Sequence, residues 1–214
     1  MNKILFSAIS KKFVMALAGL FLLLFLPIHL GINLMLLKDD PEPFNNAAHF
    51  MATFPLVKAV EILLLLAILI HVVYGLILQI QNWYLRPVRY AVRNKSETST
   101  FSKFMIWTGG AVLIFLVIHF FNFYFMKLGL VDGEPENFYS VAYDLFRIPG
   151  YVILYWVCFI LLGFHLYHSL HSAFQTLGLA NDFWTPVIKV ISLIYAIALP
   201  LGFAIIPLFI WLLK

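Results

Sequence analysis

The chain reads Gly163-Phe164-His165-Leu166-Tyr167-His168-Ser169-Leu170-His171-Ser172 inside a run, Ile148 to Ala180, that carries no acidic or basic residue. An uncharged apolar run of this length indicates a membrane-spanning helix, because about 20 residues cross the hydrocarbon core. The quoted stretch holds three of the seven histidines of the chain. Ionisable side chains are costly in a membrane and usually mark a functional site, so these histidines are candidate functional residues.

The composition of the whole chain is that of an integral membrane protein. Of its 214 residues, 63% are hydrophobic and only 11% are charged, far more apolar than a water-soluble domain requires. The single cysteine, Cys158, excludes an internal disulfide, an iron–sulfur cluster and a four-cysteine zinc site. No phosphate-binding loop or dinucleotide fingerprint occurs, so a nucleotide or flavin has no obvious place. We expect one all-α transmembrane domain over residues 1–214 that binds no nucleic acid.

Five apolar runs predict five membrane-spanning helices, over about 13–37, 57–85, 104–128, 149–176 and 185–213. Lysine and arginine concentrate near the N-terminus and in the second connection, whereas acidic residues dominate the first and third connections. The positive-inside rule then places the N-terminus in the cytoplasm and the C-terminus outside. The first four helices are expected to form a four-helix bundle, an architecture that commonly places metal and cofactor sites in its core.

The first and third runs share a spacing of glycine and histidine. Gly19 precedes His29 by ten residues, and Gly109 precedes His119 by ten residues. Each histidine stands 16 or 17 residues beyond the last lysine before its run, which is roughly 25 Å at the helical rise. The sequence therefore predicts that both histidines lie in the outer half of the membrane at nearly equal depth.

The second and fourth runs, which cross in the opposite direction, also share a spacing. His71 and His165 each stand 16 residues after the proline that opens the run, so they should lie at matching depth toward the inner half. Each has a small residue four positions later, Gly75 and Ser169 respectively. Residues four apart lie on one helix face, and a small residue there would let a flat macrocycle approach the backbone.

The four histidines thus form two level-matched pairs, His29 with His119 and His71 with His165. Zinc would need three or four protein ligands at one level. Two imidazoles per level indicate a metal already held equatorially, which means haem, and imidazole on both axial positions favours low-spin, electron-carrying iron. We therefore expect two b haems, with levels on the order of 10 Å apart along the membrane normal.

Two of these assignments have alternatives in the sequence. His168 lies about 60° from His165 around the helix and is a second candidate for the inner haem ligand. Further along, His171 is a candidate contact for a haem propionate, a quinone or a partner subunit. Gly19, Gly75, Gly109 and Ser169 are candidates for close haem approach, although small residues also serve helix packing in membranes.

Candidate quinone-site residues are fewer and less specific. They are Glu61 and His49, near the predicted outer side, and Asn33, one turn beyond His29. An exposed interfacial charge accounts better for Glu61, and a structural hydrogen bond accounts better for Asn33. The quinone site is therefore left open by the residues themselves.

Four sequence blocks carry a resemblance to a known family. They are Ala18-Gly19-Leu20 through His29-Leu30, His71-Val72-Val73-Tyr74-Gly75, Trp107-Thr108-Gly109-Gly110 through His119, and Phe164-His165-Leu166-Tyr167-His168-Ser169 ending in Phe174-Gln175-Thr176-Leu177-Gly178. With them, essentially the whole chain resembles the single-chain, five-helix, di-haem cytochrome b subunit of succinate dehydrogenases and fumarate reductases. This is the kind found in Bacillus-type and Wolinella-type complexes, and the last block resembles Bacteroidetes-type members most.

The resemblance implies a division of labour. Such a subunit anchors a flavoprotein and an iron–sulfur protein on the cytoplasmic face of the bacterial inner membrane, where the dicarboxylate chemistry takes place. It passes electrons between the iron–sulfur protein and a quinone, usually menaquinone, and the resemblance also allows a higher oligomer of the complex. By position, His71 and His165 would hold the haem near the iron–sulfur subunit, and His29 and His119 the haem near the outer face. Ser169 departs from the glycine that the family often has there.

Two other functions fit the same pattern. A di-haem cytochrome b of a hydrogenase or formate dehydrogenase would need comparable histidines. A haem-free transporter or proton channel could use intramembrane histidines as relays. Haem content and the identity of the partner subunits distinguish these three hypotheses.

Overall fold

The computed structural model describes residues 7–85, 104–134 and 137–213. Over these ranges the chain is helical and has no strand. Among the described residues, five segments are long and apolar enough to cross a membrane: Ile9–Leu37, Pro55–Tyr84, Met105–Lys127, Pro149–Thr176 and Trp184–Leu213. The predicted all-α, multi-pass architecture is therefore confirmed, and four of the five predicted spans agree with these bounds within about two residues.

The first span begins earlier than the sequence predicts. Helix α2 runs from Ala8 to Asn33, because Ser7 caps it: the Ser7 hydroxyl accepts a hydrogen bond from the Ser10 backbone N–H at 3.1 Å. Such a cap satisfies one of the N–H groups that a helix start leaves without a partner. Its lysines lie in the early turns of the helix, where long side chains can reach the membrane surface. The span continues as a short 3₁₀ turn, η1, Leu34–Leu37.

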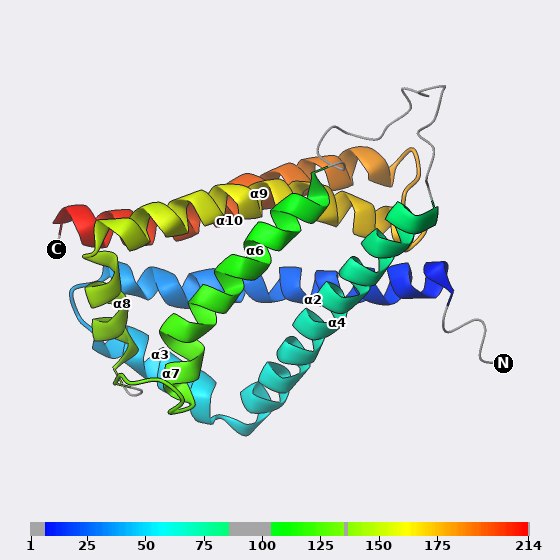
Figure 1. The fold of residues 1–214 in the computed structure, drawn as a ribbon. Helices are drawn as coiled ribbons and strands as arrows, with labels where there is room; N and C mark the ends of the chain where they lie inside the picture. The colour runs from blue at the N-terminus through cyan, green and yellow to red at the C-terminus, as the bar shows by residue number, and fades with distance from the viewer. Residues whose placement is uncertain (1–6, 86–103, 135–136, 214) are drawn as a thin grey trace.

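Helices α4 (Pro55–Leu85) and α9 (Pro149–Thr176) each open on a proline, whose fixed backbone angle and missing N–H suit the first helical position. Helix α10 (Trp184–Leu213) continues through two internal prolines. It runs alongside α9 (Figure 1). The two helices approach closely at Gly163, where an added Cβ would lie 2.7 Å from the carbonyl oxygen of Ala196.

The third span is not a uniform α-helix. It consists of α6 (Met105–His119), a π-helical turn η2 (Phe120–Tyr124) and a last turn α7 (Phe125–Lys127). The hydrophobic pattern gave no sign of this π-turn. It begins at the residue directly after His119, and single π-turns inside α-helices occur frequently at functional sites.

Two short helices, α3 (Glu42–Thr53) and α8 (Phe138–Phe146), lie together at one end of the molecule, here named the α3/α8 end (Figure 1). The side chain of Asn45 joins them: its amide donates to Asn137 Oδ1 at 3.2 Å and accepts from the Tyr139 backbone N–H at 3.1 Å. Tyr143 of α8 also donates its hydroxyl to the Leu36 carbonyl at 3.0 Å. Helix α8 lies in the third connection, where the sequence predicted an acidic loop and no helix.

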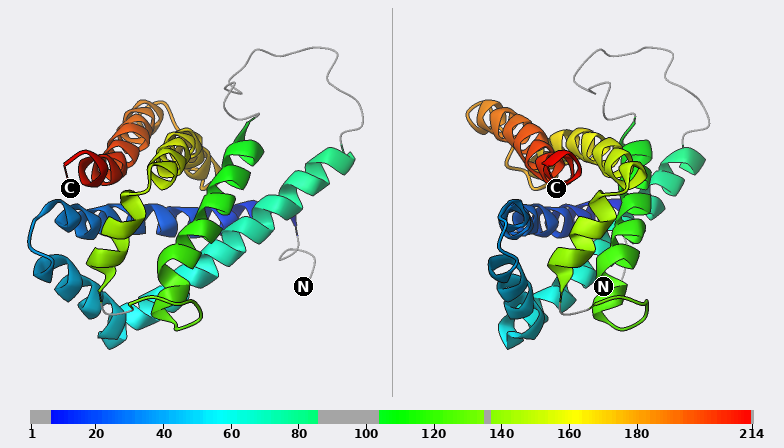
Figure 2. Two further views of the ribbon diagram at one scale, coloured as in Figure 1. Left: turned by 60° about the vertical axis from the view of Figure 1, so that its left-hand side comes forward. Right: turned by 90° about the vertical axis from the view of Figure 1, so that its left-hand side faces the viewer.

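The predicted histidines lie on four helices, α2, α4, α6 and α9, here named the helix ring. Helix α2 contacts α4 and α9, α6 contacts α9, and an ion pair between Glu61 and Lys127 joins α4 to the end of the third span. Helix α10 lies outside this ring against α9 and α2. Figure 2 shows α4 and α6 crossing α2 obliquely, with the C-terminus at the α3/α8 end.

The structure leaves the membrane orientation as a prediction. The acidic first and third connections, with α3 and α8, lie at the end of the molecule where α10 also terminates. The basic residues on which the orientation depends lie largely outside the described residues, in the segments 1–6 and 86–103.

Candidate functional site

The structure brings the level-matched histidines together in two pairs. His29 of α2 and His119 of α6, the first pair, have ring centroids 5.9 Å apart and planes inclined by 86°. His71 of α4 and His165 of α9, the second pair, have centroids 6.3 Å apart and planes inclined by 82°. The first pair lies nearer the α3/α8 end, because His29 is close to the end of α2. Each pair unites two helices that run in the same direction.

These distances fit a metal ion held between the two rings. A metal–nitrogen bond of about 2 Å and about 1 Å from ring nitrogen to ring centre, counted on both sides, give centroids about 6 Å apart. Among the described residues, no three or more histidine, cysteine, aspartate or glutamate side chains gather where they could hold a metal ion. Each level therefore offers two imidazoles, the donor set that suits haem iron with its four other ligands in the macrocycle.

The tautomer of His71 is set by the backbone of α2. Its Nδ1 lies 3.2 Å from the carbonyl oxygen of Met15. Because a carbonyl oxygen only accepts hydrogen bonds, Nδ1 must carry the proton, and the Nε2 lone pair is left for a metal. A hydrogen bond of this kind is the usual support of a metal-ligating histidine, since it fixes the ring orientation.

At the two pairs, two further ring nitrogens lack a hydrogen-bond partner among the described residues. The Nδ1 atoms of His119 and His165 are buried and have none. Buried polar atoms are normally satisfied, so each exception calls for an explanation. In both rings such a nitrogen is available as a ligand atom.

Asn33 lies beside His29 as the sequence predicts. Its side-chain amide donates to the His29 carbonyl oxygen at 2.8 Å, and the amide nitrogen lies 3.3 Å from His29 Nδ1. The Asn33 side chain therefore holds the last turn of α2 at its histidine. This is the structural hydrogen bond that sequence reasoning favoured over quinone binding.

Aromatic side chains surround the first pair, and sequence reasoning missed them. Rings with centroids 5.1–6.4 Å from those of His29 or His119 belong to Phe25, Phe115, Phe123, Tyr155 and Phe203. They exclude water from the pair and lower the local dielectric. For Tyr155 a signal was present, because it precedes His165 by ten residues, the spacing that also separates Gly19 from His29.

The two glycines of the repeat contact the second pair. A Cβ added to Gly19 would lie 3.1 Å from the His71 ring, and one added to Gly109 would lie 3.3 Å from the His165 ring. On α2 and on the third span, the glycine therefore stands at the level of the second pair, and the histidine ten residues later stands at the level of the first pair. Ten residues correspond to about 15 Å along a helix, more than the expected separation of the levels.

The other two small residues are placed differently. A Cβ added to Gly75 would meet only the sulfur of Met15, at an ordinary 3.8 Å. The hydroxyl of Ser169 donates to the Leu166 carbonyl within its own helix at 3.3 Å. Neither position is in close contact with a ring of the second pair in the way that Gly19 and Gly109 are.

The remaining histidines are His168, His171 and His49. His168 is half-buried about one turn beyond His165, which is the α9 histidine whose ring stands against His71. His171 Nε2 lies 3.0 Å from the side-chain nitrogen of Gln175. His49 is exposed on α3.

Glu61 is paired rather than solvated. One carboxylate oxygen accepts from Lys127 Nζ at 2.7 Å, and the other accepts from the Tyr124 hydroxyl at 2.9 Å. The side chains of Glu61 and Lys127 are 22% and 21% exposed. The interpretation of Glu61 as an exposed interfacial charge is therefore wrong.

Comparisons of the chain with protein-family models, with curated proteins and with solved structures gave no match. The function is therefore inferred from the two histidine pairs and their surroundings.

Proposed function

We propose that the chain is the membrane-anchor cytochrome b subunit of a succinate:quinone oxidoreductase, with two b haems held by the pairs His29–His119 and His71–His165. One observation carries the proposal: four helices place two imidazole pairs at two levels, with ring centroids 5.9 and 6.3 Å apart. Among the described residues, no third protein ligand joins either pair. A bis-imidazole haem iron exchanges one electron at a time, which is the chemistry such a subunit requires.

The residues of the chain hold and insulate these ligands. The Met15 carbonyl keeps the proton of His71 on Nδ1 and leaves Nε2 free. The aromatic side chains around the first pair exclude water, so that a charge change there is not screened by solvent. Four ring helices that satisfy their own backbone hydrogen bonds keep the two levels at a constant separation within the lipid.

The partners follow from the orientation. Under the positive-inside prediction, the second pair faces the cytoplasm, where a flavoprotein and an iron–sulfur protein would dock on the anchor. Electrons would pass between that iron–sulfur protein and a quinone, expected to be menaquinone, in a bacterial inner membrane. Glu61 and His49 stay candidates for the quinone site, whereas the bond from Asn33 to its own helix favours a structural role for Asn33.

Purification of the complex from its native membrane tests the proposal. We expect two b-type haems per chain in the reduced-minus-oxidised spectrum and the pyridine haemochrome assay. The co-purified subunits should contain flavin and iron–sulfur centres, with succinate-dependent quinone reduction or quinol-dependent fumarate reduction. A chain without haem would favour a transporter or proton channel. Two haems with a hydrogenase or formate dehydrogenase partner would favour the other cytochrome b.

Alanine at Gly109 should weaken haem binding at the second pair. The new Cβ would lie 3.3 Å from the His165 ring, so the ring must give way by a few tenths of an ångström. Displacing a group that supports a metal ligand typically costs about tenfold or more in affinity. The matched control is Gly110→Ala, whose Cβ meets nothing within 4 Å. The measurement is the rate at which each purified variant loses haem to an excess of apomyoglobin. Equal rates for the two variants would contradict this expectation.

A further inference from the structure

The π-turn after His119 changes which residues share its helix face. A regular helix turns by about 100° per residue, and a π-turn accommodates one extra residue. Tyr124 is the fifth residue after His119, but the extra residue rotates it to the position that residue i+4 has in a regular helix. Lys127 is the eighth residue and is likewise rotated to the i+7 position. Both places are on the face that carries His119. The π-turn thus directs two hydrogen-bond donors toward Glu61 of α4.

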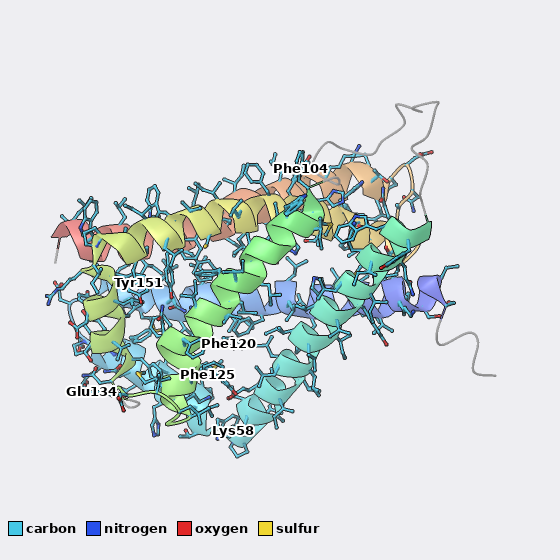
Figure 3. All side chains as sticks on the ribbon, in the orientation of Figure 1. Lys58, Phe104, Phe120, Phe125, Glu134 and Tyr151 are labelled. Atoms are coloured by element: carbon cyan, nitrogen blue, oxygen red, sulfur yellow. The ribbon has the colours of Figure 1, made fainter. Side chains whose placement is uncertain are left out.

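Both donors bind one carboxylate on a neighbouring helix. Tyr124 at 2.9 Å and Lys127 at 2.7 Å donate to different oxygens of Glu61, two turns into α4. Lys127 Nζ also stands 5.6 Å from the centre of the Tyr124 ring. Hydrogen bonds to a charged group are roughly twice as strong as neutral ones, and partial burial limits screening by solvent. Figure 3 shows Phe120 and Phe125 of this segment near the start of α4, where Lys58 is labelled.

The same segment is also held from its other side. The side-chain amide of Asn122, inside the π-turn, donates to the Tyr155 hydroxyl of α9 at 3.1 Å. The ring of Tyr155 lies 6.4 Å from that of His119. Hydrogen bonds from two neighbouring helices therefore fix the residues that directly follow His119.

We propose that Glu61, through Tyr124 and Lys127, is a positioning residue for His119: it holds the π-turn and thereby sets the rotation of that imidazole in the first haem site. The inference rests on the proposed haem function and gives Glu61 a role other than quinone chemistry. A helix that lost the clamp would be free to return to regular α-helical turns, which would rotate His119 relative to His29. The angle between axial imidazole planes and the redox potential of a bis-histidine haem both respond to such a rotation.

Three single variants separate positioning from simple electrostatics. Glu61→Gln removes a negative charge, Lys127→Met removes a positive one, and Tyr124→Phe changes no charge. A purely electrostatic effect on the first haem would shift its midpoint potential in opposite directions for the first two variants and scarcely at all for the third. Loss of positioning should change the low-spin electron paramagnetic resonance signal of that haem in the same sense in all three.

The experiment uses the purified complex with both haems bound. We expect the signal of the first haem to change in all three variants and that of the second haem to be unaltered. The charge reversal Glu61→Lys with Lys127→Glu should restore the native signal in part, because it re-forms the ion pair but gives the Tyr124 hydroxyl no carboxylate on α4 to donate to. The matched controls are Asp144→Asn and Lys38→Met, which remove one exposed charge each at the same end of the molecule.

An unchanged first-haem signal in the three single variants, with both haems present, would overturn the inference and leave the proposed function intact. Opposite potential shifts in Glu61→Gln and Lys127→Met, with no change in Tyr124→Phe, would also overturn it. A native complex that contains no haem would instead refute the proposed function. If a single variant fails to assemble, the charge-reversal pair decides. A first-haem signal closer to the native one than that of the variants that do assemble supports the clamp, and a signal as altered as theirs contradicts it.

Discussion

Replacing His165 by alanine should remove one of the two proposed haems and leave the other in place, whereas replacing His168 should leave both. The ring of His165 stands 6.3 Å from that of His71, and its Nδ1 is buried with no hydrogen-bond partner in the part of the chain that the structure describes. Loss of one axial ligand from a bis-imidazole site leaves the iron with an open position and weak retention. The pyridine haemochrome assay on the purified variants should give half the haem content for His165→Ala and the full content for His168→Ala.

The haem content should also be measured for a variant of the first pair. His119→Ala should also halve the haem content, but the missing component in a redox titration should be the one that His165→Ala retains. The double variant should contain no haem. If His168→Ala lost a haem and His165→Ala kept both, the choice of ligand on α9 would be wrong. If both histidine-pair variants lost the same component, the pairing itself would be wrong.

Alanine at Gly163 should destabilise the fold independently of any cofactor. Its Cβ would lie 2.7 Å from the Ala196 carbonyl oxygen of α10, a contact that real Cβ atoms essentially never make. The two helices must move apart, because a backbone oxygen in the middle of a helix cannot turn aside. Overpacking of this kind costs about 1–3 kcal/mol, more than the roughly 1 kcal/mol that alanine gains over glycine in a helix.

Thermal unfolding in detergent checks this prediction. Gly163→Ala should unfold at a lower temperature than the unmodified chain. Gly150→Ala, on the same helix, is the matched control because its Cβ meets nothing within 4 Å, so it should be neutral or slightly stabilising. Equal melting temperatures for the two variants would show that α9 and α10 are not in close contact at Gly163.

Much of the fold was predictable because a membrane imposes simple lengths. Apolar runs located all five spans, since a helix must be about 20 residues long to cross the hydrocarbon core. The bounds failed at Ala8, where a serine cap rather than hydropathy decides the start of the helix. Helix α8 was missed because its residues are mixed in polarity. Its position depends on hydrogen bonds that it donates to Asn45 and to Leu36, more than 90 residues away along the chain.

The candidate site was also predictable only in part. Level matching brought His29 to His119 and His71 to His165, and the structure places the members of each pair close together. The partners of Glu61 were not predictable, because Lys127 lies 66 residues away and reaches it only past a π-turn that hydropathy does not report. The contact of Gly109 with His165 was equally hidden, since spacing along one helix does not reveal what a neighbouring helix presents at that level.

The sequence by itself determined the number of spans and which histidines share a depth, because both follow from counting residues along a helix of constant rise. Only the tertiary structure decided what stands beside each ring: a backbone carbonyl at His71, a glycine at His165, and an aromatic shell with a clamped π-turn at His119. The physical reason is that depth depends on distance along one helix, whereas the surroundings of a side chain depend on how neighbouring helices are rotated and packed against it.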